Sequence, residues 1–280
     1  MQHPQARIDL HVHSTASDGV LSPSEVVCLA LEQGLTAIAL TDHDTVSGVA
    51  EALDAAAGTT LEVIPGVEIN SEGEWGDLHF LGYYVDCRNG ALNERLQVVR
   101  DARLGRAYAM VKRLGELGLP LEWEHVRALA SGESVGRPHV ARALLERGYV
   151  QTLQEAFDRY IGNDGPAYVP RLRLSPPEVI AAIVDSGGVP VLAHPAYSGA
   201  AVVARIPEFV ARGLRGLEVY YPGHTPEEIE ALLRLCRQFG LLATGGSDFH
   251  GPGHGEGAYL GSVEVPADCL DGLRVAACRR

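Results

Sequence analysis

The chain has 280 residues, a hydrophobic content of 46% and a formal net charge of −13. This length fits one barrel-sized domain or two small ones, and no apolar stretch is long enough to cross a membrane. The acidic balance argues against broad binding to long nucleic acid, although bound divalent cations would still let a local site accept phosphate.

Strand-like apolar runs alternate with helix-like segments along most of the chain. Such alternation predicts parallel βα units, and seven strands indicate a barrel or a barrel-like open sheet. The strands are expected to begin near Ile8, Ala37, Glu62, Leu78, Val189, Leu217 and Leu242.

The first expected strand carries ligand-type side chains on one face. Residues two apart in a strand point the same way, so Asp9, His11 and His13 share a face. The alternating residues Ile8 and Leu10 mark a buried strand, where unpaired polar groups are costly. Two imidazoles side by side in such a strand predict half of a metal site, because neutral imidazole is the commonest metal ligand.

Three expected helices begin with the same pattern. A serine or threonine is followed by proline and, three residues after the hydroxyl, by glutamate, which is typical of a capping box with proline at the first helical position. A glycine is then expected to end each helix. The three caps are Ser22, Ser175 and Thr225, and the three glycines are Gly34, Gly187 and Gly240.

The alternation stops between about Arg88 and Leu174, where helical patterns rich in arginine take over. We interpret residues 88–175 as a helical insertion after the fourth strand, placed over the active site at the barrel mouth. Residues 1–87 and 176–280 then form the barrel domain. Most of the arginines are expected to lie on solvated helix faces.

Other ligand-type residues lie in, or at the C-terminal end of, five later apolar runs. Parallel α/β barrels build their active sites at that end of the strands. Separate segments that obey one placement rule therefore predict a single site. The residues are His43, Glu68, His79, His194 and the pair Asp248 and His250.

Taken in order, these residues resemble the motif set of the polymerase and histidinol phosphatase (PHP) family of phosphoesterases, over nearly the whole chain. The insertion, with Arg137-Pro138-His139, makes the chain most similar to the branch of 3′,5′-nucleotide bisphosphate phosphatases and 5′-to-3′ exoribonucleases. The resemblance implies a distorted seven-stranded βα barrel. The matching motifs are His11-x-His13, Thr41-Asp42-His43-Asp44, Gly66-Val67-Glu68, His79, Ala193-His194-Pro195 and Ser247-Asp248-Phe249-His250.

The resemblance also implies three divalent metal ions, with Glu68 as a bridging ligand. Nitrogen and oxygen ligands suit manganese, zinc or iron, and the sequence does not choose among them. The implied ligands are His11, His13, Glu68 and Asp248 for the first ion, Glu68, His79 and His194 for the second, and Asp18, His43 and His250 for the third.

The implied reaction is hydrolysis of a phosphate ester. A water shared by two cations would be deprotonated near neutral pH and could attack phosphorus in line with the leaving oxygen. Glu68, Asp248 and His194 are expected to act in catalysis. Arg137 and His139 match the insertion motif implied to grip substrate phosphate, a task that suits a guanidinium fork.

The expected substrates are 3′,5′-nucleoside bisphosphates or short 5′-phosphorylated single strands, with no duplex nucleic acid and no membrane as partner. The sequence indicates no oligomeric state. The amino terminus lacks a secretory pattern, and the five scattered cysteines form no Cys-x-x-Cys pair. Both observations predict a cytoplasmic protein with reduced thiols.

Five residues admit two interpretations. Asp9 and Asp77 each precede a ligand histidine by two residues, and either holds its second ring nitrogen or forms a hydrogen bond in the barrel floor. Asp44 could likewise hold the second ring nitrogen of a ligand histidine, but its position favours the N-cap of the next helix. Asp18 lies in a Ser-Asp-Gly turn, and only the family pattern makes it a ligand. His224 either lines the barrel mouth or belongs to the loop before Thr225.

Three other functions compete with this one. A PHP phosphatase could act on another small phosphomonoester, such as histidinol phosphate. A metal-dependent amidohydrolase also begins with His-x-His on a first barrel strand, but the placement of Glu68 and His79 and the pair Asp248 and His250 argue against it. A non-catalytic metal-binding module is disfavoured by the full ligand set.

Overall fold

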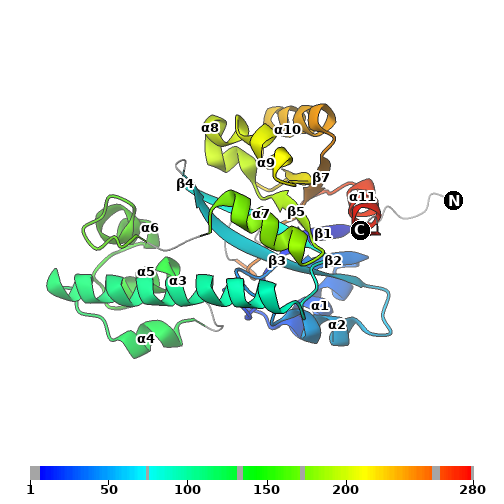
Figure 1. Ribbon diagram of the computed structural model, residues 1–280. Helices are drawn as coiled ribbons and strands as arrows, with labels where there is room; N and C mark the ends of the chain where they lie inside the picture. Colours follow the sequence, from blue (N-terminus) through cyan, green and yellow to red (C-terminus); the bar gives the residue numbers. More distant parts are fainter. Residues whose placement is uncertain (1–6, 74–75, 131–134, 171–173, 254–258, 279–280) are drawn as a thin grey trace. The chain divides into compact units, whose positions relative to one another are not determined.

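The computed structural model describes residues 7–73, 76–130, 135–170, 174–253 and 259–278 (Figure 1). The chain forms two compact units. Met1–Leu96 together with Leu174–Arg280 make the first, and Gln97–Arg173 make the second. Within the described ranges, no helix combines the length and the hydrophobicity needed to cross a membrane.

The first unit contains a curled seven-stranded sheet whose strands follow one another in chain order. Every expected strand start lies within two residues of an observed one. This arrangement confirms the predicted distorted βα barrel fold. The strands are β1 (Ile8–Val12), β2 (Ala37–Leu40), β3 (Glu62–Gly73), β4 (Gly76–Tyr83), β5 (Val189–Leu192), β6 (Gly216–Tyr220) and β7 (Leu242–Gly245).

The prediction of parallel units throughout is wrong at β4. This strand runs antiparallel to both neighbours, β3 and β5, whereas the other pairs are parallel. Strand β3 continues well past Glu68 to Gly73, which pairs with Gly76 of β4, so only two residues lie between the strands in the sequence. Hydrophobic alternation has the same period in parallel and antiparallel strands, and so it carried no information on direction.

The two edge strands of the sheet, β1 and β7, lie next to each other. The backbone N–H of His13 donates to the carbonyl oxygen of Phe249 at 2.8 Å, and the N–H of Phe249 donates to His11 O at 3.4 Å. Phe249 lies just after β7 and forms a parallel bridge with Val12. The curl therefore brings the Asp248–His250 segment next to the His11–His13 strand end.

Helices pack on both faces of the sheet. On one face, Ile8, Leu10 and other strand residues form a core with Leu273 of α11. On the other face, helices α1, α2, α7, α9 and α10 bury their apolar sides, and α7 lies across β3, β4 and β5 (Figure 1). Besides α11 (Ala267–Cys278), the helices of this unit are α1 (Pro23–Glu32), α2 (Val49–Ala56), α7 (Pro176–Asp185), η2 (Pro195–Ser198), α8 (Gly199–Val203), α9 (Ile206–Ala211) and α10 (Pro226–Phe239).

The three predicted helix starts are confirmed. In each, the backbone N–H of the cap residue donates to the glutamate three residues on, at 2.7–2.8 Å. The three predicted stop glycines follow their helices with φ of 65–76°, a left-handed conformation that glycine adopts without strain.

The described elements of the second unit are helical, and they surround a separate apolar core that includes Met110, Leu114, Val140 and Leu144. Helix α3 (Gly90–Glu116) starts in the first unit and continues into the second. It is followed by α4 (Trp123–Ala128), α5 (Arg137–Glu146), α6 (Leu153–Ala156) and the π-helix η1 (Phe157–Ile161). The predicted placement of this stretch over the barrel mouth stays a prediction.

Candidate metal centre

The two histidines of β1 open the site. Residues 8–13 are all buried, and the side chains of His11 and His13 meet two carboxylates from other parts of the sheet. His11 Nε2 lies 3.3 Å from both Glu68 Oε2 and Asp248 Oδ1. His13 Nε2 lies 3.3 Å from Glu68 Oε2 and 3.0 Å from Asp248 Oδ1. These four residues are the set expected to hold the first ion, and their ligand atoms could surround one cation.

Glu68 uses its two oxygens toward different groups of imidazoles. Its Oε1 lies 2.8 Å from His79 Nδ1 and 3.3 Å from His194 Nε2. Its Oε2 faces His11, His13 and also His43, whose Nδ1 is 2.9 Å away. A carboxylate that meets separate ligand groups through separate oxygens has the arrangement required to bridge two cations.

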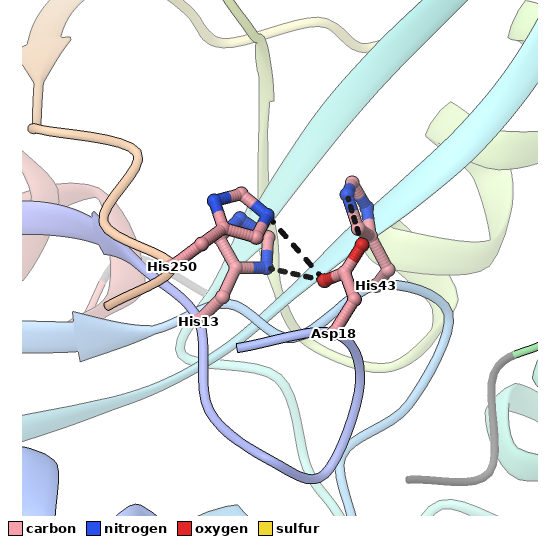
Figure 2. A group of neighbouring side chains, drawn as sticks. All are labelled: His13, Asp18, His43 and His250. Atoms are coloured by element: carbon pink, nitrogen blue, oxygen red, sulfur yellow. Dashed lines mark ion pairs between the residues drawn. The ribbon is translucent and has the colours of Figure 1, made fainter. Parts of the chain in front are cut away.

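Asp18 forms the third group, in the turn after β1. Its Oδ1 lies 3.4 Å from His250 Nε2 and 3.9 Å from His13 Nδ1, and its Oδ2 lies 3.8 Å from His43 Nε2. Figure 2 shows the carboxylate between His43 on one side and the stacked rings of His13 and His250 on the other. His13 and His43 therefore each face Asp18 with one ring nitrogen and Glu68 with the other. The predicted ligand sets assigned each of these histidines to one ion only.

The structure thus brings all nine predicted metal-ligating residues into one cluster. Several of its polar atoms are buried and lack a hydrogen bond, a condition that folded proteins avoid unless another partner occupies the space. These atoms are His11 Nε2, both ring nitrogens of His13, Glu68 Oε2 and Asp248 Oδ1. Imidazole nitrogens and carboxylate oxygens are suitable ligands for a divalent transition metal, so the residues present fit the implied cations.

The charges in the cluster are strongly coupled. Burial raises the pKa of Glu68, but His43, His79 and His11 outweigh burial and lower that pKa well below its usual range. The pKa of His13 is lowered by burial, yet Asp248 and Glu68 raise it to about 10. At His79 burial prevails, and the pKa falls below its ordinary value. The ionised carboxylates therefore face positive charge that protons supply here and that bound cations would replace.

Glu218 is a functional residue that the sequence analysis missed. It lies fully buried in β6, where its Oε1 accepts from His11 Nδ1 at 2.9 Å and its Oε2 accepts from the backbone N–H of His194 at 2.8 Å. An ionised carboxylate can only accept, so His11 carries a proton on Nδ1, and a bound cation would take the place of the proton on Nε2. The signal was present: a glutamate between Leu217 and Val219 in an apolar strand needs a partner.

The contacts of two aspartates bear on the roles predicted for them. Asp9 accepts from the N–H and hydroxyl of Ser247 and from the N–H groups of Gly261 and His11, and its described contacts include no imidazole nitrogen. This matches the alternative of a hydrogen bond inside the barrel. Asp44 is not an N-cap, because α2 begins after Gly48. It accepts instead from the backbone and side-chain N–H groups of Asn70.

The loop that carries Asp18 is fixed by Asp42. This buried carboxylate accepts from the N–H and hydroxyl of Ser14 at 2.8 and 2.7 Å and from the Ser17 hydroxyl at 2.6 Å. On the opposite side of the cluster, the hydroxyl of Tyr221 donates to Asp248 Oδ2 at 2.9 Å. The contacts of Asp42 thus hold the loop of Asp18 in place, and the contact of Tyr221 holds the carboxylate of Asp248.

Three predicted residues remain outside this cluster. His224 is buried and donates from Nδ1 to Val219 O, and its ring centre lies 5.3 Å from that of Tyr221. Arg137 and His139 lie at the start of α5 in the second unit, where Arg137 donates to Asn163 and His139 Nδ1 accepts from the Gly136 N–H. Their contact with substrate phosphate stays a prediction. The side chain of Asp77 lies outside the described part of the structure.

Comparison with known proteins points to one family. The PHP domain profile matches residues 9–161. A 5′-3′ exoribonuclease of Haemophilus influenzae is 39% identical over 249 residues, which cover 88% of this chain and 90% of that protein. A 3′,5′-nucleoside bisphosphate phosphatase of Chromobacterium violaceum is 35% identical over 271 residues, or 94% of each chain. A crystal structure from Bifidobacterium adolescentis, assigned as a metal-dependent phosphoesterase, superposes with a TM-score of 0.85 at 33% identity and covers 98% of this chain and 97% of its own.

Proposed function

Because this chain belongs to the PHP domain family and is a metal-dependent phosphoesterase, we propose that it hydrolyses phosphate esters of nucleotides. The proposed substrates are 3′,5′-nucleoside bisphosphates and short single strands with a 5′-phosphate. The observation that most strongly supports this function is the buried cluster, in which Glu68 faces separate groups of imidazoles through separate oxygens. The nucleotide class is supported by the activities of the two sequence relatives.

We propose three divalent cations, of manganese, zinc or iron, held by the predicted ligand sets. The first set coincides with a group of buried ligand atoms around His11, His13, Glu68 and Asp248. The third has His13 as an additional neighbour. When bound, such cations neutralise the phosphoryl oxygens and lower the pKa of water.

The protein residues contribute positioning and charge. Glu68 presents one oxygen to the His11 side of the site and the other to the His79 side. Tyr221 occupies Asp248 Oδ2, which leaves Oδ1 toward the β1 histidines. Glu218 fixes both a ring proton of His11 and the backbone at His194. Together these contacts hold the ligand atoms in place before substrate arrives, as electrostatic catalysis requires.

Arg137 is the proposed contact to the terminal phosphate of the substrate. Arg137→Ala should lower kcat/KM by about ten- to a hundredfold, the range for a lost charge-assisted contact of roughly 1.5–3 kcal/mol. Metal content should not change. Arg142→Ala on the same helix removes an exposed arginine that pairs with Glu146, and it is the matched control. Loss of metal or of folding in the Arg137 variant alone would make Arg137 structural.

Turnover with defined substrates tests the function directly. The metal-loaded protein should release phosphate from adenosine 3′,5′-bisphosphate and should shorten a 5′-phosphorylated RNA stepwise from that end. The same RNA with a 5′-hydroxyl should react far more slowly. Equal cleavage of both RNAs, or cutting of a circular strand, would contradict recognition of a terminal phosphate. Preference for histidinol phosphate would support the rival phosphatase function.

A further inference from the structure

A cavity of about 340 Å³ opens beside the metal-ligand cluster. Five residues of the cluster line it, and the rest of its lining consists of two tyrosines, Tyr197 and Tyr221. Its size is within the range of small-ligand sites. Tyr221 holds Asp248 through its hydroxyl, but this contact does not explain why the aromatic ring of Tyr197 lies at the same cavity.

Tyr197 is held in a fixed place next to the ligand His194. It lies in the short helix η2, which starts directly after His194. His194 adopts φ 29° and ψ 55°, a conformation rare outside glycine, while Glu218 binds its backbone N–H. The N–H of Tyr197 then donates to His194 O at 3.1 Å, and Pro195 restricts the chain between them. The contacts that position the metal ligand therefore also position this tyrosine.

The two tyrosines differ in the surface that each leaves accessible to a ligand. Tyr221 donates its hydroxyl to Asp248 and lies beside His194 at a ring separation of 5.3 Å. Tyr197 meets Tyr221 edge to face, at 5.5 Å and 76°, and 54% of its surface is exposed. Its ring centre is 6.3 Å from that of His194. An exposed aromatic ring thus lies beside His194, a member of the metal-ligand cluster.

We propose that Tyr197 is the stacking surface for the base of the nucleotide substrate. The inference rests on the proposed function and adds a specificity residue to it. In a nucleotide the base is one sugar away from phosphorus, and the exposed ring of Tyr197 lines the same cavity as the cluster, with its centre 6.3 Å from that of His194. Stacking on an aromatic ring tolerates any base, which suits an enzyme that acts on nucleotides irrespective of sequence.

Calorimetric binding to the manganese-loaded protein tests this inference. The two ligands are adenosine 5′-monophosphate and ribose 5-phosphate, which share the sugar phosphate and differ in the base. Wild-type protein should bind the nucleotide at least about fivefold more tightly, and Tyr197→Ala should remove that preference while leaving the ribose 5-phosphate affinity within about twofold. Tyr197→Phe should retain the preference. Tyr259→Ala, at an exposed tyrosine outside this cavity, is the control.

The inference is wrong if wild-type protein binds both ligands equally, if Tyr197→Ala weakens both alike, or if Tyr197→Phe loses as much as Tyr197→Ala. The last result would assign a contact to the hydroxyl instead of the ring. Failure of the proposed function gives a different result, namely a base preference in binding without turnover of adenosine 3′,5′-bisphosphate or of RNA.

Discussion

Strands β1 and β6 each carry one buried carboxylate between apolar neighbours, and the two carboxylates have different partners. Asp9 on β1 accepts hydrogen bonds from Ser247, Gly261 and the backbone of its own strand. Glu218 on β6 accepts from the ring of His11 and from the backbone at His194. The first carboxylate closes the sheet, whereas the second orients ligands of the proposed metals.

Side-chain reach explains the difference. Residues two apart in a strand are separated by about 6–7 Å, so the short side chain of Asp9 cannot reach the far side of the neighbouring imidazole of His11. The longer side chain of Glu218, from another strand of the curled sheet, meets that ring at Nδ1. A carboxylate beside a ligand in sequence is thus less suited to hold it than one that approaches from across the sheet.

Glu68→Gln should have the largest effect, because Glu68 faces the cluster with both oxygens. The amide lacks the charge needed to bridge two cations. We expect kcat to fall at least about a hundredfold and bound metal to decrease, with the fold retained. Steady-state kinetics and elemental analysis measure this, and Glu32→Gln at an exposed glutamate is the control. Activity within about threefold of wild type at saturating metal would exclude the bridging role.

Glu218→Gln tests the ligand-orienting side of the comparison. A glutamine must present its NH2 group either to His11 Nδ1 or to the His194 N–H. In the first case the imidazole tautomer reverses and places a proton toward the metal. We expect metal affinity to fall about ten- to a hundredfold, the usual cost of losing such a partner. Titration with manganese measures it. An unchanged affinity would mean that Glu218 serves packing alone.

Asp9→Asn should lower the stability of the fold and affect metal affinity less than Glu218→Gln does. Each oxygen of Asp9 accepts from at least one backbone N–H, so the amide NH2 opposes a buried donor in either orientation. The free energy of unfolding without metal should fall by about 2 kcal/mol, while metal affinity falls less than in Glu218→Gln. Denaturant unfolding and the manganese titration measure the two quantities. Equal loss of metal affinity in both variants would remove the distinction between β1 and β6.

Replacing an exposed carboxylate, that of Glu228, should change stability least. Hydrogen bonds from the N–H and hydroxyl of Thr225 hold the pKa of Glu228 below its ordinary 4.5. A carboxyl with a lowered folded pKa stabilises the fold above its unfolded pKa, and this contribution disappears as the pH falls through the folded value. Glu228→Gln should therefore be slightly less stable than wild type at pH 7, and the difference should shrink below pH 4.5. A difference that grows on acidification would contradict the assignment.

The sequence located the strands, the helix caps and the nine clustered residues, because apolar runs, capping boxes and family motifs are local patterns. It could not show that β4 runs antiparallel, since the hydrophobic period is the same in both directions. It could not identify Glu218 as the partner of His11 either, because 207 positions separate them and only the curl of the sheet joins them. Asp44 was misassigned for a related reason: its partner Asn70 lies on the next strand.

Elemental analysis after dialysis against manganese tests most directly whether the buried cluster binds divalent metal. Wild-type protein should retain tightly bound metal, with three ions per chain at saturation. Glu68→Gln should retain fewer ions, and Asp9→Asn should retain as many as wild type. A wild-type protein that keeps no metal, and whose unfolding is unchanged by added manganese, zinc or iron, would mean that the cluster is not a metal site.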